Sequence, residues 1–143
     1  MRTTRAEAAG TVGIVDPGEG LNSAIATGCA EARERGADRI LVLPIDLPCA
    51  TSEDIAALAE HASPVAIAPD RAEKGTNALC LAADLAFVPR FGEDSFPAHI
   101  AEARRLGVPI AIRPNPRLGL DIDTEADWNE WGRTLDRAAW IDG

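Results

Sequence analysis

The chain has 143 residues, a length typical of a single domain that buries a sizeable core. It carries 23 acidic against 14 basic residues, a net charge of -9, which argues against nucleic acid as a partner because a phosphate backbone binds basic surfaces. Residues 1–10 lack the apolar core of a signal peptide, and no apolar run approaches the roughly 20 residues of a membrane span, so we expect one cytoplasmic domain over residues 1–143 without membrane contact.

Short apolar runs alternate with segments of helical periodicity along the chain. This alternation predicts an α/β fold with a mostly parallel sheet and right-handed crossovers. The predicted elements are, in order, strand 11–15, helix 21–36, strand 40–45, helix 52–60, strands 64–68 and 78–82, helix 96–107, strands 109–112 and 118–122, and helix 124–140.

Three polar residues stand where predicted helices begin. Thr51 precedes a helical pattern and has Asp54 three residues later, which predicts a reciprocal capping box. Ser95 and Thr124 are the expected N-caps of the two later helices.

Asp46 follows the apolar run 40–45, at the lip of a predicted strand, where open α/β sheets bind ligands. Asp46 either binds a ligand there or caps the following turn. Asp121 and Asp123 are two residues apart on an extended segment, so their side chains share a face. The pair either lies in a solvated turn or holds a divalent cation such as Mg²⁺, with Asp46 as a third ligand.

Two polar loops are candidate anion sites. Residues 75–77, Gly-Thr-Asn, offer a flexible backbone, the Thr76 hydroxyl and the Asn77 amide, and residues 92–95 offer N–H groups and the Ser95 hydroxyl at a helix start. Each loop is alternatively an ordinary connection or a cap. His99 follows Ser95 by one helical turn and faces the same pocket or is structural.

Five stretches together carry a more specific signal than any one of them. These stretches are GLNSAI, LPIDLPCATSEDI, APDRAEKGTNAL, FGEDSFPAHIAEARRLGVP and LGLDIDTEADW. In this order they resemble the CofC/FbiD family of guanylyltransferases, which act in the biosynthesis of the deazaflavin cofactor F420. The resemblance covers the chain from about Gly20 to Trp128.

The resemblance implies a Rossmann-like nucleotidyltransferase fold. It also implies that GMP from GTP is joined to a small phosphorylated acid (2-phospho-L-lactate, phosphoenolpyruvate or 3-phosphoglycerate) and that pyrophosphate leaves. The residues that match the family's positions are Asp46, Asp121 and Asp123 for Mg²⁺ and catalysis, Thr76, Gly92 and Ser95 for the acid, with Asn77 beside them, and Asn22 for the nucleotide.

The chain departs from the family pattern before Gly20. The family begins with a strand and a Gly-rich loop whose Arg and Lys hold the triphosphate, whereas this chain has a single lysine, Lys74. We therefore expect the first βα unit to be missing, weak activity for this chain alone, and a bare sheet edge that favours aggregation or pairing, for example as a homodimer. The alternative function is a non-catalytic fragment that binds the phosphorylated acid and the metal.

Overall fold

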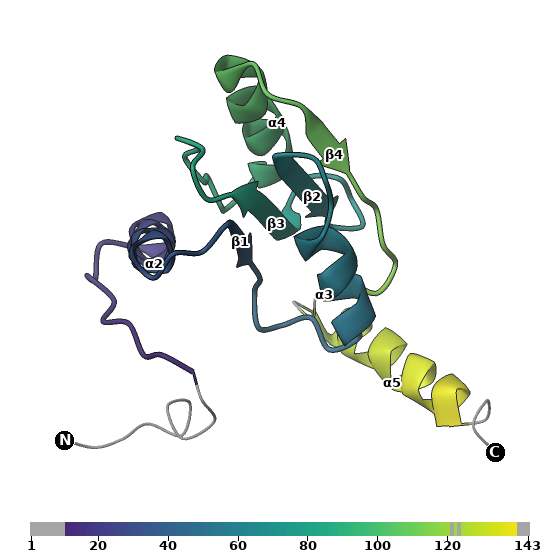
Figure 1. Cartoon of the computed structure of the whole chain (residues 1–143). Helices are drawn as coiled ribbons and strands as arrows, with labels where there is room; N and C mark the ends of the chain where they lie inside the picture. Colours follow the sequence, from purple (N-terminus) through teal and green to yellow (C-terminus); the bar gives the residue numbers. More distant parts are fainter. Residues whose placement is uncertain (1–10, 121, 123, 140–143) are drawn as a thin grey trace.

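A four-stranded sheet with helices on both faces organises the chain, seen in the computed structural model in Figure 1. The structure describes residues 11–120, 122 and 124–139. Its elements are α2 (Leu21–Glu34), β1 (Arg39–Val42), α3 (Ser52–Ala59), β2 (Val65–Pro69), β3 (Thr76–Ala82), α4 (Ser95–Leu106), β4 (Ile110–Ile112) and α5 (Glu125–Ala139).

The strands lie in the order β1-β3-β2-β4, and β3 pairs antiparallel with both of its neighbours. β2 pairs parallel with β4, so β1, β2 and β4 run in one direction and β3 runs in the other. The predicted α/β class is confirmed, and the sheet is mixed. β3 is antiparallel to β2 because the loop 70–75 that joins them is short, whereas a parallel connection needs a crossover of a dozen or more residues.

Two predicted strands are wrong. Residues 11–15 form no strand, and Val15 is 88% exposed, because the described sheet consists of β1 to β4 alone. Residues 118–120 and 122 also form no strand. The apolar side chains of Leu118 and Leu120 are nevertheless buried, so their hydrophobicity reflects packing against the core and not strand pairing.

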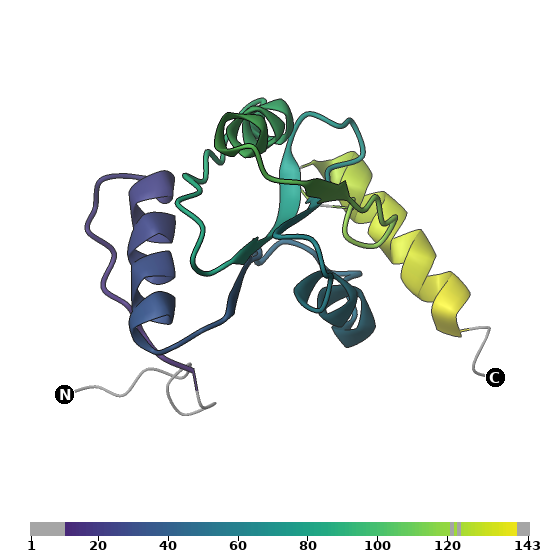
Figure 2. The same cartoon turned by 45° about the horizontal axis from the view of Figure 1, so that its top comes forward.

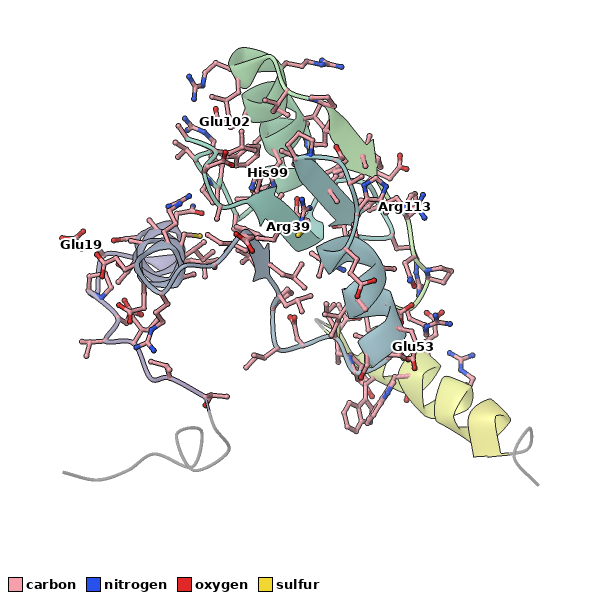
Figure 3. The ribbon with its side chains drawn as sticks, in the orientation of Figure 1. Glu19, Arg39, Glu53, His99, Glu102 and Arg113 are labelled. Carbon is pink, nitrogen blue, oxygen red and sulfur yellow. The ribbon has the colours of Figure 1, made fainter. Side chains whose placement is uncertain are left out.

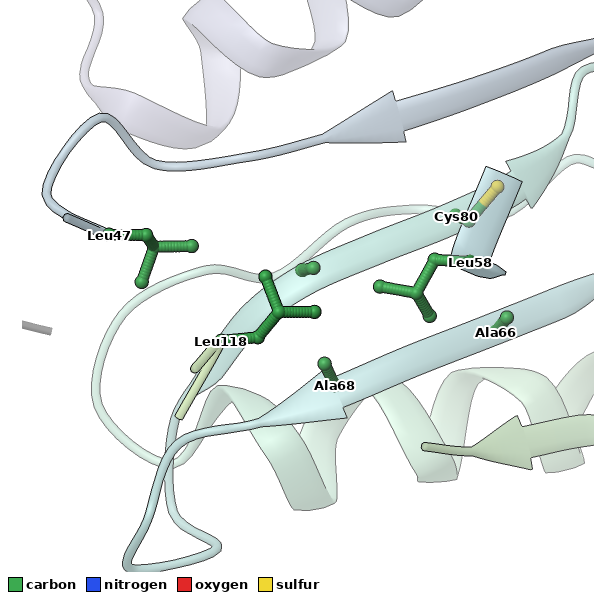
Figure 4. Close-up of a cluster of buried hydrophobic side chains, with 7 residues drawn as sticks. Leu47, Leu58, Ala66, Ala68, Cys80 and Leu118 are labelled. Carbon is green, nitrogen blue, oxygen red and sulfur yellow. The ribbon is translucent and has the colours of Figure 1, made fainter. Parts of the chain in front are cut away.

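The two faces of the sheet are packed by side chains of different size. On β2 and β3, the small residues Ala66, Ala68, Ala78 and Cys80 form a cluster with Leu58 of α3 (Figure 4). The alternate positions carry larger residues, Val65, Ile67, Leu79 and Leu81, which pack with Phe96 and Ala103 of α4. This alternation places α3 and α4 on opposite faces of the sheet, as the side-chain direction of strands requires.

The capping box predicted at Thr51 and the N-cap predicted at Thr124 are both confirmed. The Thr51 hydroxyl accepts a hydrogen bond from the Asp54 N–H, and the Asp54 carboxylate accepts one from the Thr51 N–H. Thr124 and Asp127 make the same pair of bonds at the start of α5. These local signals fix the starts of α3 and α5.

α2 lies to one side of the sheet, next to β1 at the sheet edge (Figure 2). Cys29 of α2 packs with Ile40 of β1 and with Ala83, which joins the helix to this edge strand. Ile45, just beyond β1, is fully exposed. Within the described residues, no helix is long and apolar enough to cross a membrane.

The hairpin between β2 and β3 depends on the absence of a side chain at Gly75. The Asp70 carboxylate accepts hydrogen bonds from the N–H groups of Lys74 and Gly75, and a Cβ at residue 75 would stand 2.7 Å from Asp70 Oδ2. We expect Gly75→Ala to lower the free energy of unfolding by about 1–3 kcal/mol, because the carboxylate must leave this position. Urea unfolding measures the change.

Gly28→Ala is the matched control for this substitution. A Cβ at Gly28, inside α2, meets no atom within 4 Å. Alanine there is expected to raise the free energy of unfolding by about 0.5–1 kcal/mol, as helix propensity predicts. Equal effects of the two substitutions would contradict a tight contact at residue 75.

Candidate functional site

A cavity of about 580 Å³ opens where the end of β1, the loop 70–75, the start of β3 and the start of α4 meet. Its apolar wall comes from α2 and from the end of β1. Its polar side chains come from Asp46, the loop 70–75, the start of β3 and residues 93–95. The lining residues are Leu21, Ile25, Val42, Leu43, Pro44, Asp46, Asp70, Lys74, Gly75, Thr76, Asn77, Phe91, Gly92, Glu93, Asp94 and Ser95.

Five residues predicted from the sequence line this single cavity: Asp46, Thr76, Asn77, Gly92 and Ser95. They come from three separate stretches of the chain, and the fold brings them together. The cavity therefore joins a carboxylate, hydroxyl groups, an amide and a glycine turn at one site. The individual roles of these residues remain predictions.

The other two predicted metal ligands, Asp121 and Asp123, lie outside the described residues. Ile122, which separates them in the sequence, donates its N–H to the carbonyl oxygen of Asp46 at 3.4 Å. The backbone at residue 122 thus lies beside Asp46. In the described part of the chain, no three His, Cys, Asp or Glu side chains are grouped closely enough to hold a metal ion.

Ser95 is not the N-cap that the sequence predicts. Asp94 occupies the N-cap position in the left-handed region, with φ 55°, and makes no side-chain cap bond. Ser95 is buried as the first residue of α4, and its hydroxyl oxygen accepts a hydrogen bond from the Thr76 N–H at 2.9 Å. This bond between residues distant in the sequence replaces the expected local cap and ties α4 to β3.

The start of α4 offers fewer free N–H groups than the sequence suggests. The Ser95 N–H donates to the Gly92 carbonyl and the Phe96 N–H donates to the Lys74 carbonyl. Gly92 has φ 126°, a backbone conformation that side chains rarely adopt. The N–H groups of Ser95 and Phe96 are therefore already paired, and the hydroxyl side chains of Ser95 and Thr76 line this part of the cavity.

Asn22 and Asn77 both make hydrogen bonds that hold chain segments together. The Asn22 side chain accepts from the Phe91 N–H at 2.7 Å and donates to the Phe91 carbonyl at 2.9 Å, which fastens α2 to the loop before α4. The Asn77 side chain is buried and donates to the Leu118 carbonyl at 2.9 Å. The predicted nucleotide contact of Asn22 stays a prediction beside this structural role.

Lys74 is a lining residue whose position the sequence analysis did not recognise. It is the only lysine of the chain and directly precedes the predicted anion-binding loop 75–77. This position in the sequence could have identified Lys74 as a candidate site residue. Lys74 is also the only basic residue among the described lining residues, against four acidic ones, Asp46, Asp70, Glu93 and Asp94. An anion in the cavity would therefore be attracted by one lysine and repelled by four carboxylates, unless a metal ion binds too.

Behind the cavity, His99 and Glu102 lie on the side of α4 that faces the protein interior (Figure 3). Glu102 accepts two hydrogen bonds from the Arg105 guanidinium and one from the Val88 N–H. The bond from Arg105 holds the pKa of Glu102 well below its usual value, although burial opposes this shift. Glu102 is thus a buried carboxylate that fixes the segment leading to Phe91.

Comparison with known proteins agrees with the motif resemblance. A family model described as guanylyl transferase CofC like matches residues 4–131. The chain belongs to this family. This CofC-like chain is 42% identical over 125 residues to a phosphoenolpyruvate guanylyltransferase of Sphaerobacter thermophilus, an alignment that covers 85% of the chain and 59% of that protein.

Other relatives differ in the acid that their names give. A phosphoenolpyruvate guanylyltransferase of Rubrobacter xylanophilus is 41% identical over 82% of this chain and 59% of its own length. A 2-phospho-L-lactate guanylyltransferase of Methanothermobacter thermautotrophicus is 39% identical over 65% of this chain and 42% of its own length. The chain spans less than two thirds of the length of these relatives.

A solved structure supports the fold assignment. A provisionally named nucleotide-diphospho-sugar transferase from Desulfovibrio desulfuricans G20 superimposes with a TM-score of 0.64 at 20% identity, over 82% of this chain and 52% of that one. At this identity the likeness shows the fold alone. The predicted nucleotidyltransferase type of α/β fold is therefore confirmed.

Proposed function

We propose that this CofC-like chain acts as a guanylyltransferase on a small phosphorylated acid. A phosphate oxygen of the acid attacks the α-phosphorus of GTP, a new P–O bond forms, and the bond to the leaving pyrophosphate breaks. The acid is phosphoenolpyruvate, 2-phospho-L-lactate or 3-phosphoglycerate, and the product serves the biosynthesis of cofactor F420. Such a transfer asks the protein for positioning and for neutralisation of charge.

The observation that carries this proposal is the common cavity of Asp46, Thr76, Gly92 and Ser95. Two hydroxyl groups and a glycine turn suit the oxygens of a phosphorylated acid. The Asp46 carboxylate, which lines the same cavity, suits a cation and not the anion itself. The cavity thus has the two kinds of group that an acid and a metal need side by side.

Asp46, which lines the cavity, fits Mg²⁺ because carboxylate oxygens are its preferred protein ligands. Asp46 would hold the ion together with Asp121 and Asp123, and the hydrogen bond from Ile122 to Asp46 keeps these two segments adjacent. The bound ion would supply positive charge to the phosphate oxygens. Lys74 and the two hydroxyls would orient the acid.

A second candidate is a module that binds the phosphorylated acid without turnover. The cavity favours this candidate through its charge, since Lys74 is the only base among the lining residues described. A triphosphate normally needs several cations, so GTP would bind weakly here without further basic groups. Pairing at the edge strand β1 with another polypeptide, such as a second copy, would offer one source of such groups.

Pyrophosphate release from GTP tests the proposal, with each of the three acids and Mg²⁺ supplied to the folded chain. We expect release that requires both the acid and the metal. Calorimetry with phosphoenolpyruvate and with GTP is run in parallel. Binding of phosphoenolpyruvate without GTP turnover favours the second candidate, and binding of neither molecule contradicts both candidates.

Lys74→Met is expected to weaken phosphoenolpyruvate binding about tenfold, the effect of losing one charge-assisted contact. The loss is expected to shrink at high salt, because the side chain is exposed and its charge is screened. Calorimetry at two salt concentrations measures both effects. Arg104→Met removes the same charge from an exposed position on α4, away from the lining residues, and is expected to leave binding unchanged.

A further inference from the structure

His99 is fully buried, and both of its ring nitrogens have a protein partner. Its Nε2 accepts a hydrogen bond from the Arg90 N–H at 2.9 Å. Its Nδ1 lies 2.8 Å from the hydroxyl oxygen of Thr76, a residue that lines the cavity. The ring of Phe91 packs edge-on against the imidazole, with ring centres 4.9 Å apart. The histidine thus contacts the cavity wall from behind.

These partners assign the tautomer of His99. A backbone N–H only donates, so Nε2 carries a lone pair and no proton. Burial lowers the pKa of His99 to about 4, against an opposing effect of Glu102, so the ring is neutral near pH 7. A neutral imidazole with an unprotonated Nε2 carries its proton on Nδ1. His99 therefore donates to the Thr76 hydroxyl oxygen.

This direction of the bond decides what Thr76 offers the cavity. Because its oxygen accepts a hydrogen bond from the Nδ1–H of His99, its own O–H is not used in that bond and is left as a donor. The same holds for Ser95, whose oxygen accepts from the Thr76 N–H. In the reverse arrangement, Thr76 would donate to His99 and turn only lone pairs toward an anion, which would repel it.

We propose that His99 is a positioning residue that holds the Thr76 hydroxyl as a hydrogen-bond donor toward the bound phosphorylated acid. This inference rests on the proposed function, since it takes the acid as the occupant of the cavity. His99 does not touch the acid. It acts through Thr76, and Arg90 in turn acts through His99 by holding Nε2 as an acceptor.

A double-substitution cycle tests the coupling, with the dissociation constant of phosphoenolpyruvate in Mg²⁺ as the readout. We expect His99→Leu and Thr76→Val each to weaken binding about tenfold, the effect of one charge-assisted hydrogen bond. The double variant is expected to bind as Thr76→Val does, because both changes remove the same donor. His99→Asn, whose amide retains an N–H near the Nδ1 position, is expected to restore most of the affinity.

His61→Leu is the control, since His61 pairs with the Ser63 N–H and does not line the cavity. It is expected to leave the affinity unchanged. Fully additive effects of His99→Leu and Thr76→Val, or an affinity indifferent to residue 99, would overturn the inference while the proposed function stands. A folded wild type that binds neither phosphoenolpyruvate nor inorganic phosphate would overturn both.

A measurement on the unaltered chain does not depend on a substitution at residue 99. Nitrogen-15 NMR of the histidine rings near pH 7 is expected to show a protonated Nδ1 and an unprotonated Nε2 for His99, assigned by comparison with the His61→Leu protein. A protonated Nε2 at His99 would overturn the inference. The predicted tautomer supports it, whatever the binding experiments give for GTP.

Discussion

Replacement of Asp54 by alanine is expected to lower the free energy of unfolding by about 2–4 kcal/mol, since the carboxylate is buried and joins two segments. It accepts hydrogen bonds of 2.5 to 3.0 Å from Thr51, Asn115 and Arg117. Urea unfolding measures the loss. Glu53→Ala, at the exposed neighbouring position of α3, is the control and is expected to change stability by less than about 0.5 kcal/mol.

The same carboxylate makes stability depend on pH. Its hydrogen bonds with the Arg117 guanidinium hold the pKa of Asp54 far below its usual value, although burial opposes this shift. The unfolded chain therefore takes up the proton at a higher pH than the folded chain does. The contribution of Asp54 is complete above about pH 5 and is lost as the pH falls below about 4, the ordinary range of an aspartate.

Unfolding of the wild type and of Asp54→Ala between about pH 6 and pH 3 measures this dependence. We expect the difference in unfolding free energy between the two proteins to shrink as the pH falls. A difference that stays constant over this range would show that the pKa of Asp54 is the same in the folded and unfolded chain. Equal stability of Asp54→Ala and Glu53→Ala would contradict the network itself.

Features set by neighbouring residues were predictable from the sequence. The capping box of Thr51 and Asp54 needs only a spacing of three residues, and the structure forms it. The end of α2 before Gly36 needs only a residue that tolerates positive φ, and Gly36 has φ 81°. The segments β1 to β4 were found because apolar runs bounded by turn residues indicate buried strands.

Features set by distant residues were not predictable in the same way. The direction of β3 depends on its two neighbours in the sheet, and an apolar run has no direction. Val12, Ile14 and Val15 have strand-like composition but no pairing partner in the described structure. Ser95 has the composition of a cap, yet its hydroxyl binds the Thr76 N–H across the fold.

The candidate site was predicted as a set of residue types, and the fold supplied their arrangement. Asp46, Thr76, Asn77, Gly92 and Ser95 were each ambiguous alone, because a turn, a loop or a cap explains every one of them. The motif resemblance grouped these residues, and in the structure all five line the same cavity. The hydrogen bond between His99 and Thr76 was beyond reach, since sequence spacing cannot assign a tautomer.

Asp46→Asn is expected to lower Mg²⁺-dependent pyrophosphate release from GTP by about 100-fold or more, since the metal contributes several kcal/mol of charge stabilisation. Asp121→Asn and Asp123→Asn are expected to behave alike if the three carboxylates share one ion. Each substitution keeps the size of the side chain and removes its charge. Asp84→Asn, at an exposed position apart from the lining residues, is the control.

The metal dependence separates a ligand of Mg²⁺ from a residue that only shapes the loop. A lost ligand is expected to raise the Mg²⁺ concentration needed for half-maximal rate, because affinity falls when a carboxylate oxygen leaves the coordination sphere. A loop defect lowers the rate and leaves that concentration unchanged. Asp46 is exposed, and its carbonyl accepts the Ile122 N–H through the backbone, so this bond can persist when the carboxylate becomes an amide. An unchanged Mg²⁺ requirement in Asp46→Asn would therefore argue directly against Asp46 as a ligand.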